Sequence, residues 1–437
     1  MLAITACDDE RASDRGGADP FWLPTGEPDN TSAPTIEIDA TGAMHAVYPA
    51  YAGGRAYYAV CDDGCTGTDD IEVVRFDTDG TVNDAMLALD DAGRPHVLLA
   101  TSTDVYYASC DGDCSESDAW TTTMILSHGG EREVTGEAFA LDADGRPRFL
   151  MHTYVAYLGI GQKAPETYWV GCDAQCSDAA SWSAAKIADQ IWQSTQLEFD
   201  AEGAAHIATV ATVVGEYGVS NQDVGAYLRC AGDCTSADSW IGTSLAPAFS
   251  TSLDAITVKP AIALALTHAG APRIVMLSQD ENMERNISYF ACDEGCEAVD
   301  AWGGVILSDG DDIGPGLDIA LDADDRPRFV YTIDYNIALA HCEAERCETA
   351  DARWQLEKVE AGGEMAADEI FLWENCDVGA WFLHGPSLAL GPDGEPRVGY
   401  QARDISGGWD NPDPVHTADC VAGTDMTWSR VAQLPAL

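Results

Sequence analysis

Short runs of strand-forming residues, most of them apolar, follow one another along this chain, and turns rich in glycine and aspartate separate them. One series of such runs covers residues 317–321, 328–332, 337–341 and 354–359. Short runs bounded by turn residues are typical of β-strands, and no stretch of the sequence has sustained helical periodicity. The pattern therefore predicts an all-β chain.

One short sequence motif occurs seven times along the chain. Leu-Asp-Ala-Asp-Gly-Arg-Pro-Arg at residues 141–148 returns almost unchanged at 321–328 and, with more changes, at 89–96. Neighbouring copies are 51 to 69 residues apart, a period typical of propeller blades or solenoid units. We predict a seven-bladed β-propeller of four-stranded antiparallel blades over residues 33–437, preceded by an N-terminal segment at 1–32. The weaker copies of the motif occupy residues 38–45, 199–206, 266–273 and 390–397.

A second signature follows the third predicted strand of most units. It is Cys-x3-Cys with a tryptophan ten residues after the first cysteine, as at Cys110, Cys114 and Trp120. The sixth unit stretches this spacing, and the first unit has Ile71 at the tryptophan position. We expect the repeated tryptophans to belong to the blade core, packed against the disulfide or the neighbouring blade.

The chain has 15 cysteines, too many for a cytosolic protein without metal clusters, which indicates an oxidising compartment. Zinc binding is the alternative use of paired thiolates, but each blade supplies two cysteines with no histidine at a matching distance. We therefore predict that the blades are stapled by disulfides. The predicted pairs are Cys61–Cys65, Cys110–Cys114, Cys172–Cys176, Cys230–Cys234, Cys292–Cys296 and Cys342–Cys347, with Cys376–Cys420 as a long-range seventh bridge.

Together these motifs resemble a known group of repeat proteins. Residues 93–96 match the first half of a unit of the form D-x-G-x-P-H-x-x-Y, and residues 106–110 and 289–292 match its Y-A-x-C half. Tandem units of this form resemble the secreted bacterial β-propellers related to the sialidase-like, BNR-type superfamily. The resemblance covers residues 33–437 and implies a propeller fold, but it implies little about activity because propellers host many functions.

Cys7 is left without a predicted partner. It follows Ile4-Thr5-Ala6, which resembles the lipobox of bacterial lipoproteins, where the cysteine is acylated and becomes the mature N-terminus. The acidic segment 8–19 would then be a flexible tether that holds the protein on the bacterial outer envelope. Because few residues precede Cys7 for a signal peptide, a free thiol on a disordered tail is the alternative.

The net charge limits the classes of partner. It is −52, from 74 acidic and 22 basic residues, and such a surface repels phosphate backbones, so we expect no nucleic-acid partner. The acidic residues are dispersed through turns, which indicates a solvated shell rather than one cation-binding surface. Asp-x-Asp-Gly turns resemble parts of calcium loops, but none continues into a complete loop ending in glutamate. We expect no resident cofactor, and calcium stays open.

The residue after the repeated proline position is histidine or arginine in every unit. One interpretation is a cationic ring for an anionic ligand. We favour a structural role, in which the side chain binds an aspartate a few residues earlier and fixes the hairpin, although two units have Thr267 and Gly391 in its place. The residues are His45, His96, Arg148, His206, Arg273, Arg328 and Arg397.

Catalytic signatures are missing from the sequence, which has no nucleophile elbow, zincin motif, P-loop or dinucleotide fingerprint. A true sialidase needs an arginine triad with a tyrosine and a glutamate, whereas the arginines here occupy repeat positions. Paired carboxylates for glycoside cleavage stay open, because the sequence gives no distances between its acidic residues.

Function in a propeller tends to lie where the chain departs from the repeat. Such departures occur at 155–168, 211–225 and 279–287, and the largest covers 361–386 with a partner at 403–420. Aromatic side chains there could stack on sugar rings or anchor a protein, and a hydrophobic plug over the last blade is the alternative. The predicted ligand-binding residues are Trp373, Trp381, His384, Trp409 and His416.

The sequence thus favours a non-catalytic binding protein, extracellular or at the cell surface, that presents a carbohydrate or protein ligand site on a rigid propeller. A glycoside hydrolase or lyase acting on polysaccharide is the first alternative, and a structural component of a surface assembly is the second. Carboxylates that are close together and lack counterparts in the other blades would favour the enzyme.

Overall fold

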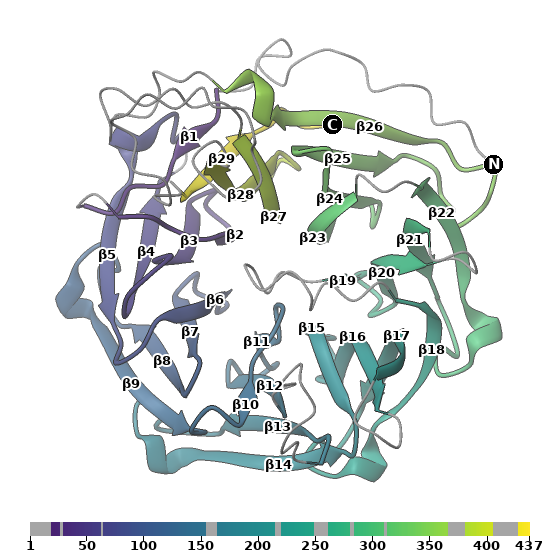
Figure 1. Ribbon diagram of the computed structural model, residues 1–437, viewed down its shortest axis with the longest axis horizontal. Coiled ribbons are helices and arrows are strands. Elements are labelled where there is room, and N and C mark those ends of the chain that lie inside the picture. Colours follow the sequence, from purple (N-terminus) through teal and green to yellow (C-terminus); the bar gives the residue numbers. More distant parts are fainter. Residues whose placement is uncertain are drawn as a thin grey trace.

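Seven antiparallel sheets stand around one axis as the blades of a propeller (Figure 1). The computed structural model describes residues 19–26, 29–62, 64–153, 164–214, 220–248, 261–279, 284–309, 313–365, 381–404 and 427–437. In most blades the four strands follow the chain from the axis to the rim. The predicted all-β fold, seven blades and four-stranded units are therefore confirmed.

The blades are numbered along the chain. Blade 1 has β2 (Thr35–Ile38), β3 (Met44–Pro49), β4 (Arg55–Cys61) and β5 (Glu72–Asp77); blade 2 has β6 (Val82–Leu89), β7 (Pro95–Thr101), β8 (Asp104–Cys110) and β9 (Trp120–Ser127). Blade 3 has β10 (Arg132–Glu133), β11 (Phe139–Leu141), β12 (Pro147–Thr153), β13 (Thr167–Cys172) and β14 (Trp182–Ala188); blade 4 has β15 (Ile191–Phe199), β16 (Ala205–Val214), β17 (Ser220–Cys230) and β18 (Ile241–Pro247). Blade 5 has β19 (Ile262–Leu266), β20 (Pro272–Gln279), β21 (Arg285–Ala291) and β22 (Gly303–Asp309); blade 6 has β23 (Ile313–Leu321), β24 (Pro327–Ile333), β25 (Asn336–Cys342) and β26 (Trp354–Ala361). Blade 7 has β27 (Trp381–Leu390), β28 (Pro396–Asp404), β29 (Thr427–Gln433) and β1 (Phe21–Trp22).

Two blades depart from the simple order. In blade 3 both β10 and β11 pair with β12, so two short strands share the inner position. In blade 7 the N-terminal strand β1 pairs with β29 and supplies the outer strand, which closes the ring. The Arg430 guanidinium lies 4.3 Å from the centre of the Trp22 ring and donates two hydrogen bonds to Glu360, which joins β1 and β29 to blade 6. The propeller therefore uses strand residues from within the segment 1–32.

The repeated motif forms the tight turn between the first two strands of a blade. In blade 3, Asp142 Oδ1 accepts hydrogen bonds from the backbone N–H groups of Asp144 and Arg146, both at 3.0 Å. Its Oδ2 atom accepts a hydrogen bond from Arg146 Nε at 2.8 Å and pairs with Arg148 at 2.9 Å. One aspartate thus caps the turn and orients two arginines, which is turn chemistry rather than calcium ligation.

The histidine or arginine after the proline has the predicted structural role. Where the aspartate is present it lies close to this side chain, as in His206–Asp200 at 3.0 Å and Arg328–Asp322 at 2.8 Å. In blades 1 and 2 the contact is longer, 3.7 Å for His45–Asp39 and 3.8 Å for His96–Asp90. Where it is absent, another carboxylate replaces it: Arg273 pairs with Asp293, and Arg397 with Glu395. Burial lowers the pKa of the histidines, so they are largely neutral at pH 7, and each of the four arginines is already paired with a carboxylate. The cationic-ring interpretation is therefore disfavoured. These histidines are His45, His96 and His206.

The repeated tryptophans join the disulfide loops of blades 2 to 6 to the preceding blade. Trp302 Nε1 donates a hydrogen bond to the carbonyl of Cys296 at 2.9 Å, and its ring lies 5.1 Å from that of Tyr227 in blade 4. The Tyr227 hydroxyl is in turn 2.7 Å from His206 Nδ1. The same contact from indole to cysteine carbonyl occurs at Trp120, Trp182, Trp240 and Trp354. The predicted packing of these tryptophans against the disulfide loop and the neighbouring blade is confirmed, with Trp240 buried and the other four half-buried.

Six disulfides staple the blades, and they are the six local pairs predicted. Cys7, Cys376 and Cys420 lie outside the described residues, so lipidation and the seventh bridge stay predictions. Disulfides at this density are typical of proteins that fold in an oxidising compartment. No helix in the described part of the chain is long and apolar enough to cross a membrane.

Side chains on the inner strands connect several neighbouring blades near the axis. The backbone N–H of Leu388 in blade 7 donates to Asp318 Oδ2 of blade 6 at 2.7 Å, and that of Leu264 in blade 5 donates to Gln196 Oε1 of blade 4 at 2.7 Å. The Ser387 hydroxyl accepts from Ile36 N across the junction that closes the ring. These buried bonds fix the spacing of the inner strands at these three junctions.

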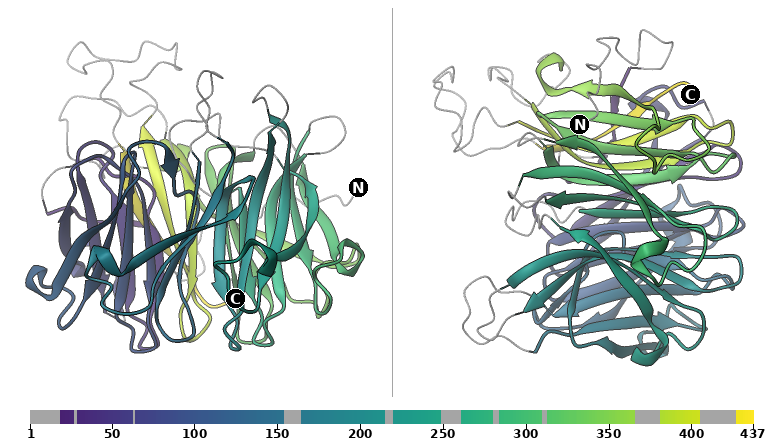
Figure 2. Two further views of the ribbon diagram at one scale, coloured as in Figure 1. Left: turned by 90° about the horizontal axis from the view of Figure 1, so that it is seen from below. Right: turned by 90° about the vertical axis from the view of Figure 1, so that its right-hand side faces the viewer.

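The antiparallel order gives the disc two different faces. The turn face carries the turns between the first two strands, such as 39–43, and the disulfide loops, and it forms the lower edge of the left view in Figure 2. The opposite connection face carries the hairpins between the second and third strands and the passages from blade to blade. Every predicted departure from the repeat joins strands whose ends lie on the connection face. Those strand pairs are β12 and β13, β16 and β17, β20 and β21, β26 and β27, and β28 and β29.

Candidate functional site

The residues predicted to bind a ligand are placed in part. Trp381 and His384 lie on β27 and are each 2% exposed. The Trp381 ring is 6.0 Å from that of Trp22, inside the core between blades 6 and 7. Trp373, Trp409 and His416 lie outside the described residues. The structure therefore brings Trp381 and His384 onto one strand, with both rings covered by protein, and the binding role of the group stays a prediction.

An aromatic patch reaches the connection face beside β27. We define it as Tyr335, in the hairpin between β24 and β25, with Phe382 and His384. The Tyr335 and Phe382 ring centres are 5.1 Å apart in a T-shaped contact, and those of Phe382 and His384 are 4.9 Å apart. Tyr335 is 51% exposed, whereas His384 is buried beneath it. Within the patch, solvent exposure therefore increases from the buried His384 imidazole to the exposed Tyr335 phenol ring.

A different set of residues gathers around the axis. Glu37 on β2 and Glu198 on β15 occupy one register position, directly opposite the repeated histidine of their blades. The other five blades have alanine at this position, opposite the histidine or arginine. Those alanines are Ala88, Ala140, Ala265, Ala320 and Ala389. The two glutamates are therefore departures from the repeat, and they come from blades on opposite sides of the ring (Figure 1).

The glutamates near the axis hold their protons unusually tightly. Burial raises the pKa of Glu37 to about 8, and the charges of Glu198 and Glu137 add to this effect. Burial likewise raises the pKa of Glu198 to about 8, with a contribution from Glu137. Because Glu37 and Glu198 are only half-buried, water reaches them. Each is thus a largely protonated carboxylic acid at neutral pH, able to donate a proton or a hydrogen bond.

Two neighbouring acids have structural contacts. The Glu137 carboxylate accepts a hydrogen bond from Gln196 Nε2 at 3.2 Å, and Asp318 accepts from Ile319 N at 2.8 Å as well as from Leu388 N. The sequence contained a signal for Glu37 and Glu198, since each precedes the repeated motif where most units have alanine. We did not predict them because the sequence alone does not distinguish a strand glutamate buried near the axis from one exposed to solvent.

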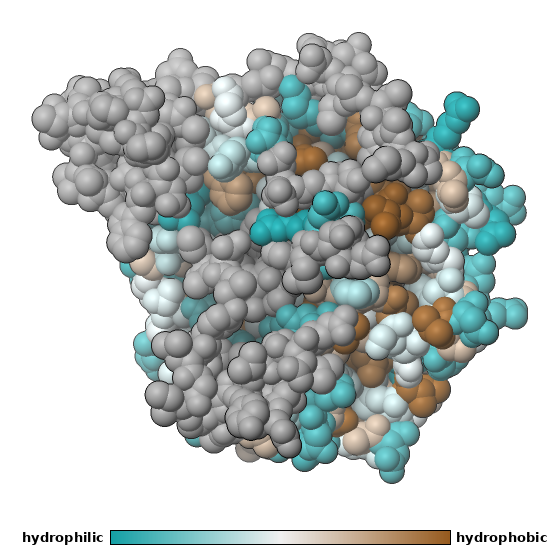
Figure 3. Space-filling view, turned by 45° about the vertical axis from the view of Figure 1, so that its right-hand side comes forward, coloured by the Kyte–Doolittle hydropathy of each residue, from teal (hydrophilic) through white to brown (hydrophobic). Residues whose placement is uncertain are grey.

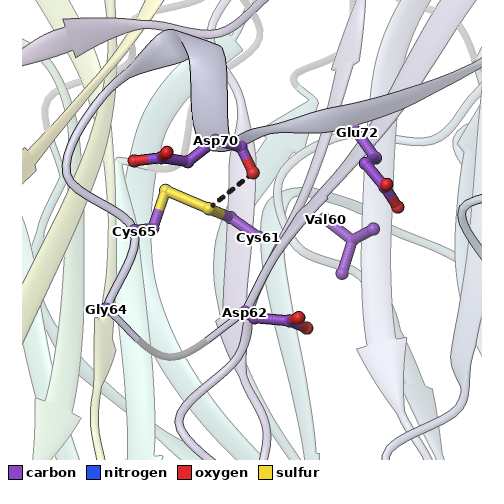
Figure 4. A pocket seen from close by; sticks show the side chains of 7 residues that line it. All are labelled: Val60, Cys61, Asp62, Gly64, Cys65, Asp70 and Glu72. Atoms are coloured by element: carbon purple, nitrogen blue, oxygen red, sulfur yellow. Dashed lines mark hydrogen bonds between the residues drawn. A yellow bond between two sulfur atoms is a disulfide. The ribbon is translucent and has the colours of Figure 1, made fainter.

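An acidic hollow of about 290 Å³ lies on blade 1 beside the Cys61–Cys65 disulfide. Its carboxylates come from Asp62, Asp70 and Glu72, and Figure 4 shows that of Asp70 directed away from the other two. Among the residues that the structure describes, no group of three His, Cys, Asp or Glu side chains could hold a metal ion. The hollow is therefore not a formed metal site.

A second hollow, of about 300 Å³, lies on the turn face between blades 5 and 6. Three arginines line it, and each already has a carboxylate partner: Arg273 with Asp293, Arg326 with Asp322, and Arg346 with Glu348. Their charges are therefore balanced within the protein, and the hollow has no surplus cation for an anionic ligand.

The rim of the disc carries small apolar patches. Ile241 on β18 and Ile306 on β22 are 52% and 56% exposed, and Figure 3 shows apolar groups separated by polar ones on the side where these strands come forward. A shallow hollow of about 240 Å³ beside Ile306 is lined in part by Ala246 and Phe290. Scattered apolar side chains are normal on soluble proteins, so we assign no function to this rim.

No protein-family model and no curated protein matches the chain. Among solved structures, it is similar to a protein of unknown function from Dyadobacter fermentans, with 12% identity, a TM-score of 0.48, and 96% of this chain and 99% of that one covered. It is also similar to the polysaccharide lyase Uly1, with 8% identity, a TM-score of 0.47, and 94% and 92% covered. The α-L-arabinanase of Penicillium chrysogenum has 11% identity, a TM-score of 0.46, and 78% and 97% covered. All three TM-scores are below 0.5, so these likenesses carry no argument about activity.

Proposed function

We propose that this protein is an extracellular carbohydrate-binding propeller whose ligand site lies on the connection face. The observation that carries the proposal is the difference between the two faces. Repeated hydrogen-bonded turns and disulfide loops complete the turn face, whereas every departure from the repeat joins strand ends on the connection face. Recognition in repeat folds generally belongs to such irregular connections on a rigid scaffold.

The class of ligand follows from the side chains and the charge. The described part of the connection face presents the aromatic patch of Tyr335 and Phe382, and aromatic rings suit the apolar faces of sugars while a tyrosine hydroxyl can bond to sugar hydroxyls. A protein with a net charge of −52 repels polyanions. We therefore infer a neutral polysaccharide rather than a sulfated or uronate-rich one.

A glycan array that contains neutral and anionic polysaccharides tests this proposal, followed by titration calorimetry with soluble oligosaccharides. The variant of choice is Trp373→Ala with Trp409→Ala, because Trp381 is a core residue whose loss would cost stability. We expect binding to neutral glycans that weakens in this variant. Binding confined to anionic glycans, or to none, would contradict the proposal and turn attention to protein ligands or surface assembly.

A polysaccharide-acting enzyme is the second candidate, favoured by Glu37 and Glu198. They are carboxyl groups without counterparts in the other blades, and their raised pKa leaves a proton available for a leaving group. A hydrolase would release reducing sugar from a bound glycan, and a lyase would generate ultraviolet absorbance from an unsaturated uronate. Activity that disappears in Glu37→Gln or Glu198→Gln, with the fold intact, would establish the enzyme. Binding without any product would establish the non-catalytic protein.

A further inference from the structure

The hairpin that presents Tyr335 has a conformation that tyrosine disfavours. Two residues, Asp334 and Tyr335, connect β24 and β25, and Ile333 pairs with Asn336 on either side of them. Their φ angles are +46° and +64°, so both lie in the left-handed region. Two-residue hairpins of this type favour asparagine or aspartate followed by glycine, because glycine lacks the Cβ atom that clashes there. Tyrosine occupies the position where glycine would be most stable.

Contacts within the protein do not account for a tyrosine at this position. Two hydrogen bonds to backbone carbonyls hold the turn: the Tyr335 carbonyl accepts from Leu383 N at 3.3 Å, and the Asp334 carbonyl accepts from Asn336 Nδ2 at 2.8 Å. Glycine would keep both bonds. Among the described residues, the ring of Tyr335 contacts Phe382 edge to face and its hydroxyl has no hydrogen-bond partner, and the residue is 51% exposed.

We propose that Tyr335 is a ligand-stacking residue, which packs its phenol ring on the face of a neutral sugar while Phe382 supports the ring from behind. This inference rests on the proposed function and adds the residue and the subsite to it. The two-residue hairpin constrains the backbone of Tyr335 and the contact with Phe382 limits the orientations of its ring, which reduces the ordering cost of binding. Its hydroxyl is available to a sugar hydroxyl at the edge of the ring.

The test compares binding and stability in the same variants. Tyr335→Ala and Tyr335→Gly should each weaken binding of the best neutral glycan from the array by at least about tenfold, and Tyr335→Phe should keep most of it. Because glycine relieves the left-handed strain, Tyr335→Gly should also raise the Tm, by about 1–3 °C. The matched control is Gln175→Gly on the turn face, where Gln175 has a φ angle of +57° and an exposed side chain. It should raise the Tm to a similar extent and leave binding unchanged.

The outcomes separate this inference from the function on which it rests. If the wild-type protein binds a neutral glycan and Tyr335→Ala and Tyr335→Gly bind it equally well, the subsite is wrong and the proposed function stands. If the wild-type protein binds no neutral glycan, the proposed function fails and the subsite with it. A fall in Tm for Tyr335→Gly, while Gln175→Gly raises it, would show that the tyrosine stabilises the hairpin and would overturn the argument from strain.

Discussion

The two glutamates near the axis should make the protein less stable as the pH rises. We consider the double substitution Glu37→Gln and Glu198→Gln, which keeps the shape of both side chains and removes their titration. The folded-state pKa of each glutamate is about 8, against a usual value of 4.5 in the unfolded chain. Between these values the folded protein binds more protons than the unfolded chain, so the free energy of unfolding falls as pH rises from 4.5 towards 8 and is level outside this window.

The size of the effect follows from the difference in proton affinity. Each tenfold change in affinity is worth about 1.4 kcal/mol, which gives an upper bound of about 5 kcal/mol for each glutamate. Both side chains are half-buried and in contact with water, which screens their charges. We therefore expect about 1–3 kcal/mol for the pair, as a gain in stability of the double variant over the wild-type protein at pH 8. At pH 4.5 and below, the two proteins should be nearly equal, because a protonated glutamate resembles glutamine.

Urea unfolding followed by tryptophan fluorescence at several pH values measures this difference. The control is Glu72→Gln on β5, which removes one negative charge from an exposed site on the rim. General repulsion in this acidic protein also weakens with falling pH, and the control shows how much of the trend it explains. The difference in the free energy of unfolding between the double variant and the wild-type protein should grow from pH 5 to pH 8. If this difference is the same at both pH values, the raised pKa values are refuted, and they no longer support the enzyme hypothesis.

Three further predictions concern the scaffold. Reduction should lower the Tm sharply, since each Cys-x3-Cys bridge closes a small loop and constrains the unfolded chain by about 2 kcal/mol; a Tm that does not respond to reductant in differential scanning calorimetry would contradict this. Trp302→Phe keeps the contact with the Tyr227 ring and removes the hydrogen bond to the Cys296 carbonyl. The free energy of unfolding, measured with urea, should therefore fall by about 1–2 kcal/mol, and an unchanged value would show that the bond is dispensable. Arg430→Ala removes the guanidinium that pairs with the buried Glu360 carboxylate where the ring closes. The free energy of unfolding should fall by about 3–5 kcal/mol, and a fall of less than about 1 kcal/mol would show that this ion pair contributes little to ring closure.

Repetition explains why so much of the fold could be predicted from the sequence. A turn aspartate such as Asp142 and an indole such as Trp302 recur with the same neighbours in several blades, so each copy supports the interpretation of the others. The same repetition identified the six local disulfides. The spacing also favoured a structural role for Arg148 and His206, because an aspartate precedes each of them by the same number of residues.

The proposed ligand site could not be predicted from the sequence in the same way, because the observations that support it are burial and backbone conformation. Trp381 and His384 were selected as aromatic residues outside the repeat, yet the structure covers both. Tyr335 was overlooked because tyrosine in a β-rich sequence is ordinary, and its significance comes from a φ angle of +64°. Neither the exposure of a ring nor the sign of φ has a reliable signature in a single sequence.

We expect the positions that matter for function to be those where a blade carries a structurally unfavourable residue that the other blades lack. Five blades place alanine near the axis, and two place a glutamate whose burial works against its charge. The hairpin of blade 6 places tyrosine where glycine would be less strained. Repeat units share one architecture, so a costly exception is not required by the blade and needs a separate reason. Exchanging each exception for the unstrained residue should therefore raise stability, and a loss of ligand binding or turnover in the stabilised protein would identify which of the two sites performs the function.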